Sequence, residues 1–474
     1  MSQPSDYPHE LFPLAQAQVR EWDHDTNPQL YPNKNIGAAV IFPFTVDYNL
    51  LQTALNHMIQ VNEGLRLQFT LRPDEGFADD DLSAPSDEPK LTPMQFVTPY
   101  QPMRLPLMDF SAATNPREAF DHWFDAVFQQ TFNLIEQPMY EFYYVRIDDD
   151  HTGVLAKFHH IISDGYSISL LLHSLLDCYQ TLAGGGELSA ELMPSFIDYV
   201  LREQRYLSSN KCRRDKEYWL EQFYDLNKVD PHYLYNHPGF MKIRREVQRF
   251  DEDKSERLLR YLHENKLSLN GFFIAAMAIY HAGRIGGLRA LIGTIIFNRP
   301  TKDDKSTIGQ YISTIVSRVR VNPRLSAAEQ LRKMDEDLMV DLFHQKYPYN
   351  RMKDDLDLDQ MGYTGLFRYN VNCYTVNYLD KQTAPVSMNV PGCEIKGSFT
   401  SYSNNSCQLI INEDENHVLI MSTDYKTEEY SRAFIQSMHR GIEDLAMAIC
   451  DDDKQTLASL MGQLSYPASA DPLA

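Results

Sequence analysis

Two spacings of hydrophobic residues alternate along the chain, and each predicts a different kind of element. Apolar residues in short runs or at every second position indicate strands, whereas apolar residues three and four positions apart indicate helices. Residues 36–44 and 65–72 predict strands. Between them, apolar residues recur at helical spacing after Asp47, so we expect a helix with Asp47 as its cap. Pro116 suits the first position of another helix, which we expect to end near residue 132.

Two adjacent histidines lie at the end of a predicted β-hairpin. Residues 139–147 and 152–160 both have the pattern of strands, and the acidic turn between them is short enough for a hairpin. The second of these strands ends at His159 and His160. Apolar residues at helical spacing follow Ser167, where we expect a helix to begin.

The second half of the chain repeats this alternation, after a segment, AGGGELSAEL, with the composition of a linker. We expect an N-terminal lobe over residues 1–182, a linker over 183–193 and a C-terminal lobe over 194–474. In the C-terminal lobe the pattern predicts helices at 194–207, 213–223, 271–287 (capped by Ser268 or Asn270), 326–345 and from Ser431, and strands at 289–300, 365–378, 407–414 and 417–425. The expected fold class is therefore α/β with two lobes.

Composition limits the classes of partner. The chain has 474 residues, with 44 Lys and Arg against 65 Asp and Glu, and a formal net charge of −21. Such an acidic surface repels phosphate backbones and anionic lipid headgroups, so we expect neither nucleic acid nor a membrane as a partner. The acidic runs Asp74–Pro89 and Cys450–Gln455 are typical of solvated loops.

Cysteine usage and hydropathy favour a reduced environment. The six cysteines form no Cys-x-x-Cys pair, and the N-terminus has no basic segment followed by an apolar one. No apolar run reaches the ~18 residues that a membrane span needs. We therefore expect a cytoplasmic protein without a structural metal.

The histidine pair is the clearest candidate for chemistry. Neighbouring side chains on a strand point to opposite faces, so His159 and His160 cannot easily share a metal ion or a hydrogen-bond partner. Asp164 can fold back beneath the end of the strand, and Gly165 suits a backbone position with positive φ. A single histidine beside an apolar helix is most often a packed core residue, but a pair followed by Asp-Gly is more specific. A neutral imidazole at the edge of a lobe can accept or relay a proton near pH 7, as a general base does.

Other familiar sites are missing from the sequence. A zinc site would need a third and a fourth ligand at usable spacing, and none are present. The motifs of serine hydrolases, P-loops and dinucleotide-binding folds are also absent.

The segment HHIISDG resembles the HHxxxDG signature of the condensation domains of nonribosomal peptide synthetases and their chloramphenicol-acetyltransferase-like relatives. Further segments resemble the family's motifs, in the family's order; they are LAQAQVREW, VNEGLRLQF, FNLIEQPMYEF, PSFIDYV with DKEYWLEQF, IGTIIFNRP with IGQYISTIVSRVRV, and HQKYPYN. One departure is Glu141, where the family usually has arginine. Each match is weak alone, but the series in register covers nearly the whole chain.

This resemblance implies a fold of two chloramphenicol-acetyltransferase-like lobes in a V, with an active-site tunnel between them that carrier-bound substrates enter from opposite faces. It implies that His160 reaches into this tunnel as the catalytic residue. It implies structural roles for His159, Asp164 and Gly165, with Asp164 paired to Arg299 as a clamp on the turn.

Asn372 lies in YNVNCY, where the family has the asparagine of its FNYQ motif. The resemblance implies that an amide at this position can donate to the oxyanion of a tetrahedral intermediate. The alternative is a strand asparagine whose hydrogen bonds are satisfied by its neighbours.

The reaction that the resemblance implies is acyl transfer, in which the amine of an aminoacyl thioester attacks an acyl thioester and forms an amide. The acceptor would be carried by a peptidyl carrier protein, and the donor would be an acyl-CoA or an acyl carrier protein. Phosphopantetheine or CoA would thus present the substrates, with no permanently bound cofactor. Whether His160 removes the amine proton or holds the amine by a hydrogen bond stays open.

The subtype is expected to be a starter domain, which acylates the first amino acid of a lipopeptide. The sequence YSISLLL after HHIISDG differs from epimerisation domains, and the DxxxxD pattern of heterocyclisation domains is absent. The match begins at residue 11, and the segments NRPTKDDKSTIGQYIST and SCQLIINEDENHVLIMSTDYKTEEYS resemble starter domains more than elongating ones. The match ends about where an adenylation domain would follow in a longer synthetase. The alternatives are an elongating condensation domain, a free-standing ester-forming acyltransferase and a non-catalytic module that docks carrier proteins.

Overall fold

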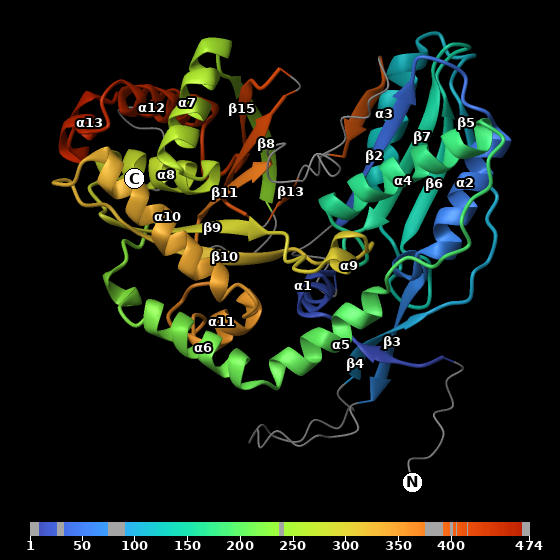
Figure 1. Ribbon diagram of the computed structural model, residues 1–474, viewed down its shortest axis with the longest axis horizontal. Helices are drawn as coiled ribbons and strands as arrows, with labels where there is room; N and C mark the ends of the chain where they lie inside the picture. Colours follow the sequence, from blue (N-terminus) through green and yellow to red (C-terminus); the bar gives the residue numbers. More distant parts are fainter. Residues whose placement is uncertain are drawn as a thin grey trace.

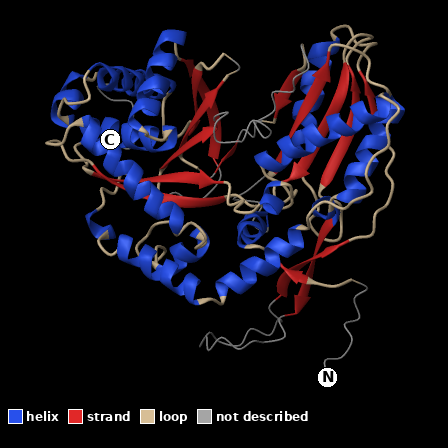
Figure 2. Ribbon diagram, in the orientation of Figure 1, coloured by secondary structure: helices blue, strands red, loops and turns tan. Residues whose placement is uncertain are grey.

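Two lobes, each a β-sheet with helices packed against it, make up the chain (Figures 1 and 2). They diverge toward one end and so give the molecule the outline of a V. The computed structural model describes residues 9–25, 33–73, 91–236, 241–374, 392–398, 402–403, 405–414 and 416–466. The predicted two-lobed α/β fold class is confirmed.

The N-terminal lobe is built on a five-stranded sheet in the order β12-β2-β7-β6-β5. β5 is parallel to β6, and the other neighbouring strands are antiparallel. The strands are Glu394–Gly397 (β12), Asn35–Phe42 (β2), Thr152–His159 (β7), Tyr140–Arg146 (β6) and Leu107–Asp109 (β5). β6 and β7 form the predicted hairpin. Every residue of β7 is buried, because this strand is central in the sheet.

Helices cover this sheet on both faces. The capping signals in the sequence are confirmed: the Asp47 carboxylate accepts the N–H groups of Asn49 and Leu50, and Pro116 begins its helix. Phe120 of that helix packs into one apolar cluster with residues of β2 and β7, while the other two helices share a larger core with the opposite face. The helices are α2 (Tyr48–Val61), α3 (Pro116–Gln129) and α4 (Gly165–Ala183).

A smaller sheet and one helix lie beside the meeting point of the lobes (Figure 1). The sheet has the order β1-β4-β3 and is antiparallel throughout. These elements are β1 (Phe12–Pro13), α1 (Gln16–Asp25), the 3-10 turn η1 (Glu63–Arg66), β3 (Leu67–Pro73) and β4 (Leu91–Val97). The acidic run Asp74–Pro89, predicted as a loop, lies outside the described residues.

The C-terminal lobe is built on a seven-stranded sheet in the order β10-β9-β11-β14-β15-β8-β13. β11 is parallel to both of its neighbours, and the remaining pairs are antiparallel. The strands are Met241–Arg249 (β8), Arg289–Ile296 (β9), Ser313–Arg320 (β10), Tyr369–Tyr374 (β11), Tyr402–Ser403 (β13), Cys407–Glu413 (β14) and Leu419–Lys426 (β15).

The most buried helix of this lobe is α8, whose first fourteen residues are all buried. Ser268 caps it through the N–H of Gly271, and Gly286 ends it with φ +77°, a conformation that glycine adopts without strain. Ser431, from which the last long helix was predicted to run, is the cap of that helix. The helices are α5 (Phe196–Leu207), α6 (Asn210–Gln222), α7 (Glu252–Asn265), α8 (Leu269–Ile285), α9 (Lys302–Lys305), α10 (Ala327–Phe343), α11 (Tyr349–Asp355), α12 (Arg432–Asp451) and α13 (Leu457–Gln463), with a 3-10 turn η2 (Leu226–Lys228).

The chain crosses between the lobes in more than one place. α4 ends at Ala183 and α5 begins at Phe196, with no helix or strand between them. Yet Phe196, Ile308 and Tyr311 belong to the apolar core of the N-terminal lobe, and β12 pairs with β2. The predicted lobe division at residues 183–193 stays a prediction, because segments from far beyond it complete the N-terminal lobe.

Candidate active site

The two histidines have different surroundings because β7 ends between them. His159 is the last residue of the strand; its ring is buried, lies edge-on to Phe132, and accepts the N–H of Ile161 at 3.1 Å through Nδ1. His160 follows in a turn, where its N–H donates to the Lys34 carbonyl at 2.9 Å and the residue as a whole is only partly buried. His159 is therefore completely enclosed in the lobe, whereas His160 is not.

His160 is in an environment that favours its neutral form. Loss of hydration lowers the pKa of His160 below its ordinary value of 6.5. The Glu21 carboxylate of α1 acts in the opposite direction, and the positive charges of Lys34 and Arg20 add to the lowering. The net direction is downward, so His160 is uncharged at pH 7 and has a lone pair on one ring nitrogen.

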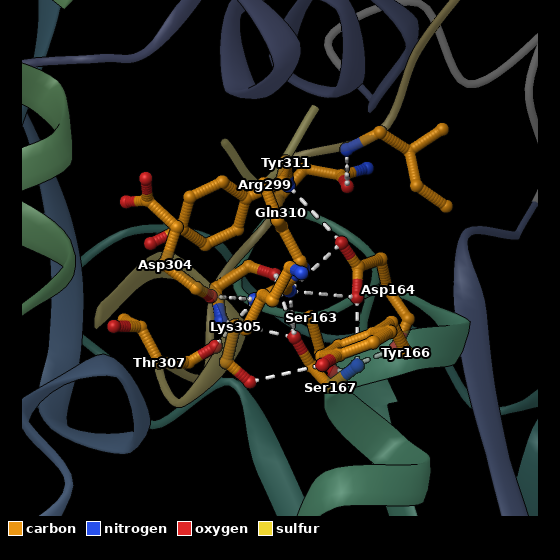
Figure 3. A network of polar contacts seen from close by, with 12 residues as sticks. Ser163, Asp164, Tyr166, Ser167, Arg299, Asp304, Lys305, Thr307, Gln310 and Tyr311 are labelled. Carbon is orange, nitrogen blue, oxygen red and sulfur yellow. Dashed lines mark hydrogen bonds and ion pairs between the residues drawn. The ribbon is translucent and has the colours of Figure 1, made fainter. Parts of the chain in front are cut away.

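Asp164 caps α4 and is the centre of a polar network (Figure 3). Its Oδ1 atom accepts the N–H of Ser167 at 2.7 Å, and its Oδ2 atom accepts the N–H of Tyr311 at 3.2 Å. The Arg299 guanidinium lies 3.0 and 3.1 Å from the two carboxylate oxygens through Nη2. The side chain of Asp164 is fully buried, so these donors replace the water that it has lost.

Arg299 is held as firmly as the carboxylate. Its Nη1 atom donates to the carbonyl oxygens of Asp304 and Thr307, each at 2.6 Å, and the guanidinium lies over the rings of Tyr166 and Tyr311 (Figure 3). The pair joins the loop after β9 in one lobe to the first turn of α4 in the other. The contact predicted between Asp164 and Arg299 is therefore present in the structure.

The expected backbone conformation of Gly165 is wrong. Gly165 is the first residue of α4, and its φ is not in the positive range. The helix thus begins at Gly165 rather than at Ser167, because the cap is Asp164, three residues before the N–H that it binds. A Cβ atom added to Gly165 would meet nothing within 4 Å, and the residue is exposed. The packing of the chain around this position therefore does not require glycine.

Asn372 is a buried residue of β11, and only one end of its side-chain amide is hydrogen-bonded. Its Oδ1 atom accepts the N–H of Ile295 at 2.9 Å, while its Nδ2 atom has no partner among the residues that the structure describes. It makes no hydrogen bond to His160. The structure thus brings His160, Asp164 and Arg299 to one place. Asn372 lies on β11, which pairs with β9, the strand before Arg299.

Gln310 is a neighbour of His160 that the sequence alone did not reveal. The Gln310 side chain is fully buried, and its Nε2 atom lies 2.8 Å from Nδ1 of His160. The residue lies within IGQYIST, a segment that resembles one of the family's motifs. No spacing rule could have found the contact, because the two residues are 150 positions apart.

The described residues contain no cluster of three or more histidine, cysteine or acidic side chains that could hold a metal ion. Of the helices in the same part of the chain, none is long and apolar enough to cross a bilayer.

Comparison with protein families identifies the chain. The family described as "Condensation domain" matches residues 9–463. Surfactin synthase subunit 1 of Bacillus subtilis (strain 168) is 26% identical over 440 residues, which are 89% of this chain and 11% of that protein. Malpinin synthetase of Mortierella alpina is 21% identical over 361 residues, which are 74% of this chain and 4% of that protein. The chain therefore spans about a tenth or less of the length of these curated relatives.

Solved structures share the fold. The starter condensation domain of the rhizomide synthetase RzmA superposes with a TM-score of 0.75 at 19% identity, over 95% of this chain and 98% of that one. The first condensation domain of the calcium-dependent antibiotic synthetase gives a TM-score of 0.75 at 17% identity, over 95% and 99%. From the family match over residues 9–463, the chain belongs to the condensation-domain family, whose members form amide bonds by acyl transfer.

Proposed function

We propose that this chain transfers an acyl group from a thioester to the amine of an aminoacyl thioester on a peptidyl carrier protein. The observation that carries the proposal is the state of His160: neutral, partly exposed, and directly after the central strand of the N-terminal lobe. In the same turn, His159 and Asp164 are enclosed and fully engaged, so His160 is the histidine that a substrate can meet.

The chemistry asks little of the protein beyond placement. A thioester is already activated, so the amine attacks its carbonyl, the C–N bond forms, the C–S bond breaks, and the amine proton ends on the released thiol. Bringing the two substrates together accounts for much of the rate, because alignment removes the entropic cost of a bimolecular encounter. A hydrogen-bond donor at the carbonyl oxygen also stabilises the negative charge that develops on this oxygen.

The network around Asp164 fits the role of a rigid support in this proposal. Asp164 and Arg299 fix the first turn of α4 against the loop after β9, and His160 lies four residues before that turn. Asn372 offers an amide donor, Nδ2, with no partner among the described residues. We assign it the role of a second polar group toward the intermediate, subordinate to His160.

The donor is proposed to be a fatty acyl-CoA or an acyl carrier protein, as in a starter domain that begins a lipopeptide. Supporting observations are the segments NRPTKDDKSTIGQYIST and SCQLIINEDENHVLIMSTDYKTEEYS, which resemble starter domains, and the likeness to the RzmA starter domain, a variant of which was crystallised with C8-CoA. Phosphopantetheine and CoA thus enter as substrate carriers rather than as bound cofactors. The adenylation domain expected as a neighbour in a longer synthetase stays a prediction.

Product mass tests the proposal. The chain is incubated with a series of acyl-CoA donors and an aminoacyl carrier protein, and the carrier is analysed by mass spectrometry. We expect N-acylated aminoacyl carrier with wild type and little with His160→Ala. Equal product from both proteins, or none from either, would contradict the catalytic role. Product from a peptidyl carrier donor alone would instead assign the chain to elongation, and product only with an alcohol acceptor would assign it to ester formation.

A further inference from the structure

Gln310 is a fully buried side chain between α9 and β10 whose amide has a fixed orientation. Its Oε1 atom accepts the N–H of Ile312 at 3.2 Å. A backbone N–H only donates, so the oxygen of the Gln310 amide must face Ile312. The NH₂ group therefore faces Nδ1 of His160, at 2.8 Å.

This orientation has a consequence for the proton on His160. An amide NH₂ group only donates, so Nδ1 must supply a lone pair to receive it. A neutral imidazole has one N–H, and with Nδ1 unprotonated that hydrogen is on Nε2. A charged imidazole would have hydrogen on both nitrogens and would place one N–H against another at 2.8 Å. The contact thus favours one neutral tautomer over the other and over the charged form.

The other groups around His160 do not fix the tautomer. Glu21 favours the charged ring, while Lys34 and Arg20 disfavour it. The carbonyl of His160 itself acts against Gln310, because it would accept a hydrogen from Nδ1. Among the described residues, Gln310 is the only side chain with a hydrogen bond to the His160 ring.

We propose that Gln310 is a positioning residue that holds His160 as the Nε2–H tautomer, so that His160 offers the substrate a hydrogen-bond donor instead of a general base. The catalytic part of this inference rests on the proposed function, whereas the tautomer does not. In the reaction, the Nε2–H group stabilises the negative charge that builds on the thioester as the C–N bond forms and the C–S bond breaks. The amine proton ends on the thiol, and His160 is unchanged at the end.

The tautomer is measured directly on the protein without substrate. In ¹⁵N-histidine-labelled protein, long-range ¹H–¹⁵N correlations distinguish protonated from unprotonated ring nitrogens, and His160→Ala identifies the signals of residue 160. We expect protonated Nε2 and bare Nδ1 in wild type. In Gln310→Glu the carboxylate accepts a hydrogen from Nδ1, so we expect the tautomer to reverse and the titration midpoint of His160 to rise. Gln310→Met, of similar size, removes the donor and should also raise the midpoint.

Activity separates the two roles of the ring. If His160 acts as a donor, Gln310→Glu should lower kcat by about tenfold or more, as expected when a donor to a developing oxyanion is lost. If His160 were a base, a carboxylate on Nδ1 would orient it as in a catalytic triad and kcat would hold or rise. Gln330→Glu is the matched control, because Gln330 is also buried and its Oε1 atom also accepts a backbone N–H at 3.2 Å, that of Asn322.

Each part of the inference has an outcome that overturns it. A wild-type ring protonated on Nδ1, or a tautomer unchanged in Gln310→Glu, would refute the positioning role even if no acyl transfer were ever found. Unchanged or higher kcat in Gln310→Glu, relative to Gln330→Glu, would refute the donor role. Absence of product in wild type would refute the proposed function and leave the tautomer result standing. Should Gln310→Glu fail to fold, the wild-type spectrum and Gln310→Met still decide the tautomer.

Discussion

The turn after β7 contains two polar regions that differ in how completely their groups are paired. Around Asp164, both carboxylate oxygens and two nitrogens of Arg299 have partners, and the side chains of both residues are almost entirely buried. Around His160, the ring has one hydrogen bond to a side chain of the described residues, that of Gln310, and the residue is only partly buried. The two regions are four residues apart in sequence.

This difference separates a support from a reactive group. In this buried ion pair both carboxylate oxygens and two of the three guanidinium nitrogens have partners, and only Nε of Arg299 has none among the described residues. Such a pair gives little to a substrate, but it is costly to disturb, since either partner alone is a buried charge. An imidazole with one hydrogen-bonded nitrogen adds less to the stability of the protein, and its other nitrogen can bind a ligand. Substitutions on the two sides should therefore differ in what they damage.

The largest expected effect is on stability, at Asp164. Asp164→Ala leaves Arg299 buried without its carboxylate and leaves the N–H groups of Ser167 and Tyr311 without an acceptor. We expect the free energy of unfolding to fall by about 3–5 kcal/mol, which is typical when one partner of a buried pair is removed. Urea denaturation followed by circular dichroism measures the loss, and a lower soluble yield should accompany it.

An exposed ion pair is the control for this prediction. Arg257 and Asp451 form a pair on the surface of the C-terminal lobe, with exposed fractions of 35% and 67% for their side chains. Asp451→Ala should change the free energy of unfolding by less than about 1 kcal/mol. Equal effects at Asp164 and Asp451 would show that the Arg299 network is not the support that its geometry indicates.

The opposite pattern is expected at His160. His160→Ala removes the acceptor of the Gln310 amide, but residue 160 is only partly buried, so water can take the place of the ring and the free energy of unfolding should change by about 1 kcal/mol. The rate of acyl transfer should fall by about 10²-fold or more, which is the usual contribution of a positioned proton donor or acceptor. Single-turnover acylation of the carrier, with the free energy of unfolding measured on the same preparation, tests the separation. If His160→Ala lowered the free energy of unfolding as much as Asp164→Ala, His160 would have a structural role like that of Asp164.

Local signals in the sequence predicted much of this arrangement. The hairpin of β6 and β7, the cap Asp47 and the start of the last long helix at Ser431 depend on residues a few positions apart, and all are confirmed; of the two alternatives for the cap of α8, the structure has Ser268. β8 was not predicted, because five of its nine residues are exposed or only partly buried charged residues, and its pattern has no clear apolar face. β10 and β12 are also absent from the predicted strands. β12 obtains its place from β2, a partner strand distant in sequence, whereas β10 pairs with β9, the strand before it along the chain.

The candidate site divides in the same way. The motif drew attention to His160 and Asp164, and the family resemblance suggested Arg299 as a partner from 135 positions away. The environment of Gly165 was predicted wrongly, because a cap at Asp164 moves the helix start forward and removes the need for positive φ. Gln310 could not be predicted, since its contact with His160 depends on how the loop before β10 lies against the other lobe.

A smaller effect should distinguish the two histidines themselves. His159→Ala removes a buried ring, so the N–H of Ile161 loses its acceptor. We expect the free energy of unfolding to fall by about 1–3 kcal/mol, the cost of an unsatisfied buried donor. In the folded fraction at low temperature, acyl transfer should be affected less than by His160→Ala. Thermal denaturation of the two variants side by side makes the comparison, and a larger loss of stability for His160→Ala would reverse the assignment of support and reactive group.

The smallest effect is the dependence of stability on pH that His160 contributes. Burial lowers the pKa of His160 below its ordinary 6.5. As the pH falls below 6.5, the unfolded chain takes up a proton at this residue while the folded chain does not, so wild type loses stability until the pH reaches the lowered pKa. His160→Ala lacks this contribution, whereas other buried histidines such as His281 and His439 contribute equally to both proteins.

The difference in unfolding free energy between wild type and His160→Ala should therefore shift by at most about 1.4 kcal/mol per pH unit, in the variant's favour. Urea denaturation at pH 7.5, 6.5 and 5.5 measures it. A difference that does not change with pH would mean that His160 has the same pKa in the folded and the unfolded chain, and that its surroundings do not favour the neutral ring.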